Sequence, residues 1–435
     1  MTEAIGEDPG AIQQARASGG FFAVAAGLGV FGLATYGYLG FAGRDLGSVG
    51  FAPLSVLWTL LNAFGIGLFL PFEQELGRRT AERRATGDGN APVVRRALAG
   101  AGITLGAVAV LAALGAGILS NRLFGGRVEM VPLFVLAIAG MAASYVVRGL
   151  LSGNGRFHRY GAQLAVDGVL RLGGAALLYF AGVSSVLAYG SLLVITPVLS
   201  VLLTTPRPSS IVTPGPPHAA RVAAVGLGAL IAASLLSQIL ANAGPIMVEL
   251  LATADEAEAS GQFVAALVIA RVPLFVFAAV QAVLLPGLAA SVGARDAATF
   301  RARMAQVGLA TLVIGVVGTL AVWFLGPQLV PLLFSDAFGT DRGVITLIAG
   351  SGAVFMLAQA AAQGLLALGA ERFVVVGWSS GLAALTLALA WDGPIAERAA
   401  VALLAGSAGA MAVLAAGLLS TYRRWVEGAL AAPVA

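Results

Sequence analysis

The sequence predicts an all-α, polytopic membrane protein with about twelve transmembrane helices. Of its 435 residues, 59% are hydrophobic and 11% are charged, whereas a soluble domain carries about 25% charged residues. The apolar residues gather in stretches of about 20, the length of helix that crosses the core of a bilayer. Most arginines lie between these stretches rather than inside them. A chain of this composition is expected to bury its apolar surface in lipid.

Taken in chain order, the apolar stretches give twelve candidate spans. They cover residues 20–41, 52–73, 98–119, 130–150, 162–182, 185–204, 222–244, 262–288, 305–326, 343–365, 373–391 and 399–420. Between the sixth and the seventh span lie residues 206–221, whose proline and serine content is typical of a non-helical, cytoplasmic linker. The linker divides the chain into an N-terminal six-helix bundle at 1–205 and a C-terminal six-helix bundle at 222–435.

The distribution of arginine predicts the orientation. All 25 basic residues are arginines, and eighteen of them fall in the N-terminal segment and in alternate loops. The other side of the predicted membrane has five: Arg44, Arg122, Arg127, Arg342 and Arg398. This positive-inside bias places both termini in the cytoplasm and requires an even number of spans. The excess of alanine, glycine, valine and arginine is typical of a bacterial genome rich in G and C, which indicates the bacterial cytoplasmic membrane.

A weak internal repeat connects the two halves at an offset of 215 residues. The sequence that starts Arg148-Gly-Leu-Leu ends the fourth span, and the one that starts Gln363-Gly-Leu-Leu ends the tenth. Pro71 and Pro286 are related by the same offset. Six spans per half return the chain to its starting side, so the halves are expected to be parallel repeats around a central cavity.

Two arginines lie deep inside predicted spans, Arg171 in the fifth and Arg271 in the eighth. A charge at the centre of a membrane helix costs about 2.5 to 3.5 kcal/mol, so both are expected to face a hydrated, protein-lined interior. Asp167 precedes Arg171 by one helical turn and can form an ion pair with it. Arg271 has no such neighbour in sequence. We interpret all three as substrate-binding residues, with a purely structural ion pair as the alternative for Asp167 and Arg171.

Polar residues on the seventh span share one helix face. Ser234, Gln238 and Asn242 recur every four residues, which aligns them on a stripe that should face protein or water. Amides of other spans are predicted to face the same interior: Asn62, Gln281, Gln359 and Gln363. Ser234, Gln238, Asn242, Gln281 and Asn62 complete the predicted substrate-binding set, although such residues also serve as hydrogen-bonding contacts between helices.

Several classes of function are not supported. The chain has no cysteine, and its two histidines lie in predicted loops without ligand-spaced companions, so no metal site or other cofactor is predicted. It has no phosphate-binding loop of the G-x-x-x-x-G-K-[ST] type, so energy would have to come from an ion gradient, the membrane potential or the supply of substrate. The predicted outer loops are too short for a folded catalytic site. Transport is therefore favoured over enzymatic activity.

Charges at the cytoplasmic ends of the spans are interpreted as topological. Glu73 and Glu75 are expected to be solvated or paired with the arginines that follow them. The arginine doublets around residues 78–96 are expected to set topology and to contact anionic lipid head groups, without affinity for nucleic acid.

The chain resembles bacterial polysaccharide exporters of the multidrug, oligosaccharidyl-lipid and polysaccharide exporter superfamily. The resemblance rests on the outer loop at 43–50, the run Pro71-Phe-Glu-Gln-Glu-Leu-Gly-Arg-Arg79, the Arg148-Gly-Leu-Leu sequence and the arginine of the eighth span. It implies a two-bundle flippase that moves a polyprenyl-pyrophosphate-linked oligosaccharide to the outer leaflet by alternating access. The implied partners are this anionic lipid-linked glycan, membrane lipids, and polysaccharide polymerase or glycosyltransferase machinery.

Two other functions remain open at this point. A multidrug or other small-molecule exporter, of the same superfamily or similar to major-facilitator carriers, would also have twelve spans. A membrane scaffold that transports nothing would share the composition as well. A pyrophosphate is bound well by the forked donors of arginine, which favours the flippase.

Overall fold

The computed structural model is all-helical over its described residues, which are 9–216, 221–253, 256, 258–274, 277, 288, 291–339 and 341–431. The N-terminal half contains α1 (Pro9–Leu60), η1 (Leu61–Ile66), α2 (Gly67–Ala85), α3 (Ala91–Leu114), α4 (Ala116–Ile118), η2 (Leu119–Leu123), α5 (Met130–Gly153), α6 (Phe157–Phe180) and α7 (Val186–Thr204). The remainder contains η3 (Pro208–Ser210), α8 (Arg221–Leu251), α9 (Ala259–Ala270), α11 (Ala297–Leu333), η5 (Asp336–Phe338), α12 (Arg342–Ala367), α13 (Glu371–Ala388) and α14 (Ile395–Ala431).

Nine of the described helical segments are long and apolar enough to cross a membrane. The first of them covers 64 residues and holds two predicted spans, because the chain turns at Gly47, whose φ of 69° favours glycine. The shorter helices α9 and α13 occupy the two predicted spans that remain. The predicted all-α, polytopic fold of about twelve spans is therefore confirmed.

The eighth predicted span differs from a straight helix. Helix α9 ends at Ala270, and Arg271 lies at its C-terminal cap. Two residues later, Pro273 has no N–H with which to continue the helical hydrogen bonds, which is why the helix is interrupted here. The interruption places a charged side chain at a helix C-terminus, where carbonyl groups favour a cation.

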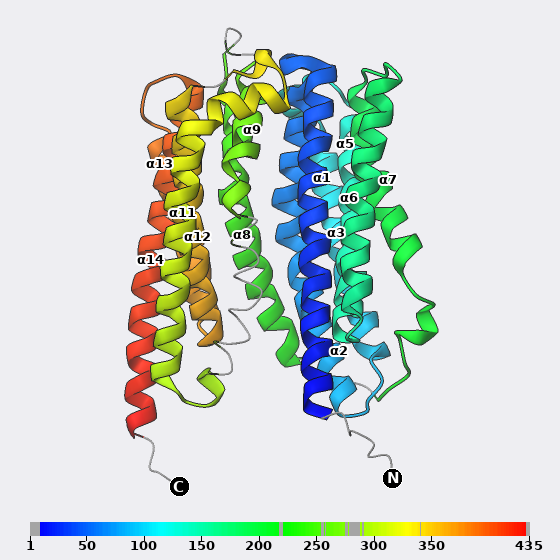
Figure 1. The fold of residues 1–435 in the computed structure, drawn as a ribbon, viewed down its shortest axis with the longest axis vertical. Coiled ribbons are helices and arrows are strands. Elements are labelled where there is room, and N and C mark those ends of the chain that lie inside the picture. Colours follow the sequence, from blue (N-terminus) through cyan, green and yellow to red (C-terminus); the bar gives the residue numbers. More distant parts are fainter. Residues whose placement is uncertain are drawn as a thin grey trace, which may run out of the picture.

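The helices form two groups, α1 to α7 and α8 to α14 (Figure 1). In the first group α1 packs along α6 and α2 along α5, and in the second α14 packs against both α12 and α13. The beginning of α1 and the end of α14 lie at the same end of the molecule (Figure 1), as an even number of spans requires. That end carries the arginine-rich loops and is cytoplasmic by the prediction above.

Contacts between the two groups are well defined at the opposite, outer end. The centre of the Phe51 ring lies 5.8 Å from the centre of the Phe334 ring and 5.7 Å from that of the Phe338 ring. Arg44 donates hydrogen bonds to the carbonyl oxygens of Leu332 and Leu333, at the end of α11. These contacts join α1 to the other group and close the outer end.

The first part of the linker is attached to the N-terminal group. Asn90 donates to the carbonyl of Ile211 at 2.8 Å, and Arg83 donates to that of Pro216 at 2.8 Å. Arg83 is buried, and Arg84 donates to the carbonyl of Asn154. The expectation of a lipid head-group contact is therefore wrong for Arg83, which is buried and bound to backbone carbonyls of the protein. For the exposed Arg84 it stays a prediction.

Candidate functional site

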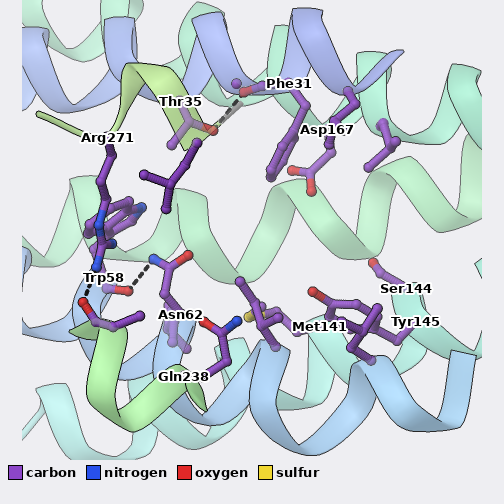
Figure 2. A pocket seen from close by; sticks show the side chains of 18 of the residues that line it. Phe31, Thr35, Trp58, Asn62, Met141, Ser144, Tyr145, Asp167, Gln238 and Arg271 are labelled. Carbon is purple, nitrogen blue, oxygen red and sulfur yellow. Dashed lines mark hydrogen bonds between the residues drawn. The ribbon is translucent and has the colours of Figure 1, made fainter. Parts of the chain in front are cut away.

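A cavity of about 440 Å³ lies between the two groups of helices. Its wall is made by α1, η1, α2, α5, α6 and α7 on one side and by α8, α9 and α12 on the other. Figure 2 shows side chains from both groups converging on this space. Pockets of roughly 300 to 1,000 Å³ accommodate small ligands or the head group of a larger one.

Arg271 enters this cavity from the end of α9 (Figure 2). Its Nη1 donates to Asn242 Oδ1 at 3.0 Å, and its Nη2 donates to the carbonyl of Ala241. Asn242 is buried and donates from Nδ2 to the carbonyl of Gln238 at 2.8 Å. The amides of α8 thus fix the orientation of the guanidinium, and Gln238 and Asn242 line the cavity beside it.

No acidic residue neutralises Arg271 within the part of the chain that the structure describes. The ion pairs found there involve other residues. Residues 275–290, which follow in sequence and are mostly outside that part, contain no aspartate or glutamate.

Asp167 and Arg171 form the ion pair that their spacing on α6 predicts. Arg171 Nη2 lies 3.0 Å from Asp167 Oδ1, which also accepts a hydrogen bond from Thr196 Oγ1 at 2.6 Å. The guanidinium carbon of Arg171 lies 5.0 Å from the centre of the Phe31 ring. Both charged side chains are buried and line the cavity, so this pair adds no net charge to it.

A second buried ion pair lines the cavity nearer the cytoplasmic end. Arg148 Nε on α5 lies 2.9 Å from Glu73 Oε2 on α2, and Tyr160 donates to Glu73 Oε1 at 2.6 Å. The guanidinium carbon of Arg148 lies 4.2 Å from the centre of the Tyr145 ring. All four side chains line the cavity.

This cluster corrects two interpretations made from sequence. Glu73 is buried rather than solvated, and its partner is Arg148 rather than one of the arginines that follow it. Glu75 does pair with Arg78 and Arg79, as expected. The signal that could have revealed the cluster is that Glu73 and Arg148 both fall inside predicted spans, with opposite charge, at the cytoplasmic ends of those spans.

The remaining predicted residues have different positions. Asn62 lines the cavity and donates to the carbonyl of Trp58 at 2.7 Å (Figure 2). Ser234 shares the stripe of Gln238 but does not line the cavity. Next to it in sequence, Leu235 packs closely on α2. A Cβ at Gly67 would lie 2.9 Å from Leu235 Cα. Gln281 lies outside the described residues.

The charges of the cavity wall are unequal. Glu73 offsets Arg148 and Asp167 offsets Arg171, whereas Arg271 has no counter-ion among the described side chains. A net positive charge in a space shielded from bulk solvent attracts anions and repels cations. No group of three or more histidine or acidic side chains placed to hold a metal occurs in the residues described.

Similar sequences are found in mycobacteria. The chain is 29% identical over 399 residues to the uncharacterised protein Rv1510 of Mycobacterium tuberculosis, covering 87% of this chain and 86% of that protein. It is 27% identical over 426 residues to the uncharacterised protein Rv3630 of the same organism, with 91% of each chain covered. No family model matches the chain.

The fold is similar to that of MATE family transporters of the MOP superfamily. An inward-facing multidrug resistance transporter of this family superposes with a TM-score of 0.68, at 14% identity, over 93% of this chain and 96% of that one. The MATE transporter VcmN of Vibrio cholerae gives 0.65 at 16% identity, over 95% and 98%. A MOP superfamily transporter of Pyrococcus furiosus, described as having a binding pocket of reverse polarity, gives 0.67 at 15% identity, over 93% and 95%.

Proposed function

We propose that this multi-pass membrane protein is a transporter that flips a polyprenyl-pyrophosphate-linked oligosaccharide from the cytoplasmic to the outer leaflet by alternating access. The observation that carries the proposal is the uncompensated guanidinium of Arg271 in a cavity whose other charges are paired. The MATE-like fold supports it, because the solved structures with this fold are those of transporters. The similarity is one of fold, so the substrate is argued from the cavity alone.

The chemistry of Arg271 suits a pyrophosphate. A guanidinium presents several N–H groups in a planar fork that matches phosphate oxygens. Two unit charges about 4 Å apart attract by about 4 kcal/mol at an effective dielectric constant of about 20, which is enough to discriminate between an anion and a cation. Asn242 already orients this fork, so less conformational freedom is lost when an anion binds.

The rest of the cavity suits a polar head group on a lipid. Gln238, Asn62 and Gln359 contribute amide groups that can hydrogen-bond sugar hydroxyls, and the ring of Trp58 contributes an aromatic face. A volume of about 440 Å³ accommodates a head group but not a long polyprenyl chain. The polyprenyl chain of the substrate would therefore remain in the bilayer while the head group crosses between the two helix groups.

Export of small amphiphilic molecules is the second candidate, because solved structures of this fold are described as multidrug resistance transporters. A cationic drug needs an available acid in the cavity. Here Glu73 and Asp167 are each engaged by an arginine, and Arg271 repels cations. These charges favour the anionic substrate.

The deciding experiment is a flipping assay with the purified protein in liposomes. The substrate is a fluorescent polyprenyl-pyrophosphate-linked oligosaccharide, and outer-leaflet exposure is read by quenching. We expect Arg271→Ala to lower the rate at least about tenfold, as loss of a charge-assisted contact of this kind implies. Arg271→Lys should restore part of the rate, and Arg342→Ala, an exposed arginine near Trp323, is the matched control.

Three outcomes would contradict the proposal. If Arg271→Ala flips the lipid at the wild-type rate, the site assignment is wrong. If the wild-type protein moves a labelled cationic drug but not the lipid, the exporter function is correct. If it moves neither, while the purified protein remains folded, a scaffold function is favoured.

A further inference from the structure

The ion pair between Arg148 and Glu73 uses only one nitrogen of the guanidinium. Its side chain is 10% exposed, and its Nε donates a hydrogen bond to Glu73 Oε2 at 2.9 Å. The Nη1 and Nη2 groups, which form the forked end of the guanidinium, make no hydrogen bond to the carboxylate of Glu73, and the Tyr145 side chain lies beside the guanidinium. Because the residue lines the cavity, this end is accessible from the space between the helix groups.

Each member of the Glu73–Arg148 pair also has a second partner. The Tyr145 ring, whose centre lies 4.2 Å from the guanidinium carbon, stabilises the cation through its face. Tyr160 donates a hydrogen bond to Glu73 at 2.6 Å. If the pair separates, Arg148 keeps Tyr145 and Glu73 keeps Tyr160. The cost of opening the pair is lower than for an ion pair with no other contacts.

We propose that Arg148 is a second anion-binding site of the cavity, and that Glu73 is an internal counter-ion which the phosphate groups of an arriving substrate displace. A phosphate or pyrophosphate binds the Nη groups, which Glu73 does not use, and competes with the carboxylate for the guanidinium. The proposal rests on the proposed function for its substrate class, an anionic lipid head group. The binding site itself is defined by Arg148, Glu73, Tyr145 and Tyr160 alone.

The position of this site fits a first point of contact. On α6, Asp167 and Arg171 follow Tyr160 by seven and eleven residues, about 10 and 16 Å further from the cytoplasmic end at about 1.5 Å per residue. Arg148 itself lies five residues before the cytoplasmic end of α5. An anion entering from the cytoplasmic side would therefore meet Arg148 before it reaches Arg171.

A counter-ion role predicts an unusual result, namely that loss of a buried salt-bridge partner improves ligand binding. The test measures binding of inorganic pyrophosphate to the full-length protein in nanodiscs by calorimetry. We expect Glu73→Gln to tighten binding about tenfold, because the neutral amide no longer competes for Arg148. The double variant Glu73→Gln/Arg148→Gln should lose this gain. Glu75→Gln, on the same helix but paired with Arg78 and Arg79 outside the cavity, should bind like the wild type.

The same measurement in an Arg271→Ala background separates this proposal from the proposed function. Binding that persists there, and that Glu73→Gln still tightens, supports a separate site at Arg148. If Arg271→Ala abolishes all binding in the Glu73→Gln protein, Arg148 is not a site, and the proposed function is unaffected. If the Arg148 site is present but flipping is independent of Arg271, the proposed function fails and the site remains.

If the Glu73–Arg148 pair has only a structural role, the binding measurement should give a different result. If Glu73→Gln is folded and leaves pyrophosphate binding unchanged or weaker, the counter-ion proposal is overturned. Should Glu73→Gln not fold, Glu73→Asp provides the test. It retains the charge but shortens the side chain, so it loosens the contact with Arg148, and binding should tighten by about twofold to threefold. No change with Glu73→Asp likewise overturns the proposal.

Discussion

The Nη1 of Arg271 lies 3.0 Å from the Oδ1 of Asn242, so the guanidinium at the end of α9 is held by a side-chain amide of the preceding helix, α8. Asn242 is 1% exposed, and its own Nδ2 is held by the carbonyl of Gln238. These hydrogen bonds restrict the rotation of the Arg271 side chain, as the proposed anion-binding role requires.

Asn242 provides the sharpest test of cavity charge. Asn242→Asp places a carboxylate of almost the same shape beside Arg271, so it should neutralise the cavity and lower lipid flipping about tenfold or more. Asn242→Ala removes the hydrogen bond but keeps the charge, and should lower the rate less. The liposome assay measures both. Equal rates for the two variants would show that orientation rather than charge is decisive.

Replacing Asp167 alone is expected to affect the stability of the fold differently from replacing Asp167 and Arg171 together. Asp167→Ala leaves Arg171 buried without a counter-ion and should destabilise the fold by about 3 to 5 kcal/mol. The double variant Asp167→Leu/Arg171→Met should be close to the wild type in stability. Thermal unfolding in detergent gives the comparison. If the double variant is stable and still flips lipid, the pair is structural, and loss of flipping with full stability would assign it a role in transport.

Arg44 is expected to hold the outer end closed. Its hydrogen bonds to the carbonyls of Leu332 and Leu333 join the two helix groups, and each such bond contributes about 0.5 to 1.5 kcal/mol. Arg44→Ala should therefore raise the population of the outward-open state several-fold. Because the chain has no cysteine, Thr35→Cys in the cavity is a unique reporter for an impermeant thiol reagent. Labelling from the outer side should accelerate in Arg44→Ala and stay unchanged in Arg122→Ala.

Because α1 packs closely on α6, the stability of the protein should depend on the glycines at their contact. A Cβ at Gly161 would lie 2.1 Å from the carbonyl oxygen of Ala23, and one at Gly27 would lie 2.2 Å from that of Gly161. Gly161→Ala should destabilise the protein by about 1 to 3 kcal/mol through overpacking. Gly173→Ala on the same helix has nothing within 4 Å and should be neutral or stabilising by up to about 1 kcal/mol. Similar melting temperatures for the two variants would contradict this packing.

Much of the fold could be predicted because its determinants are local. The length of each apolar stretch and the arginines between stretches predict helices and their direction, since the bilayer imposes one thickness and one charge asymmetry. Asp167 and Arg171 could be paired from sequence because four residues make one helical turn. The interruption after Ala270 was also signalled locally, by Pro273.

The sequence by itself was therefore enough to predict a membrane protein of many helices, with Arg171 and Arg271 deep inside two of its spans. Only the tertiary structure decided which side chains meet. Glu73 and Arg148 are 75 residues apart and Arg271 and Asn242 are 29 apart, on different helices. Gln238 and Asn242 line the cavity, whereas Ser234, one turn before Gln238 on the same stripe, does not. These relations depend on how helices pack against one another, and helical periodicity specifies the face of each helix but not the neighbour that the face meets.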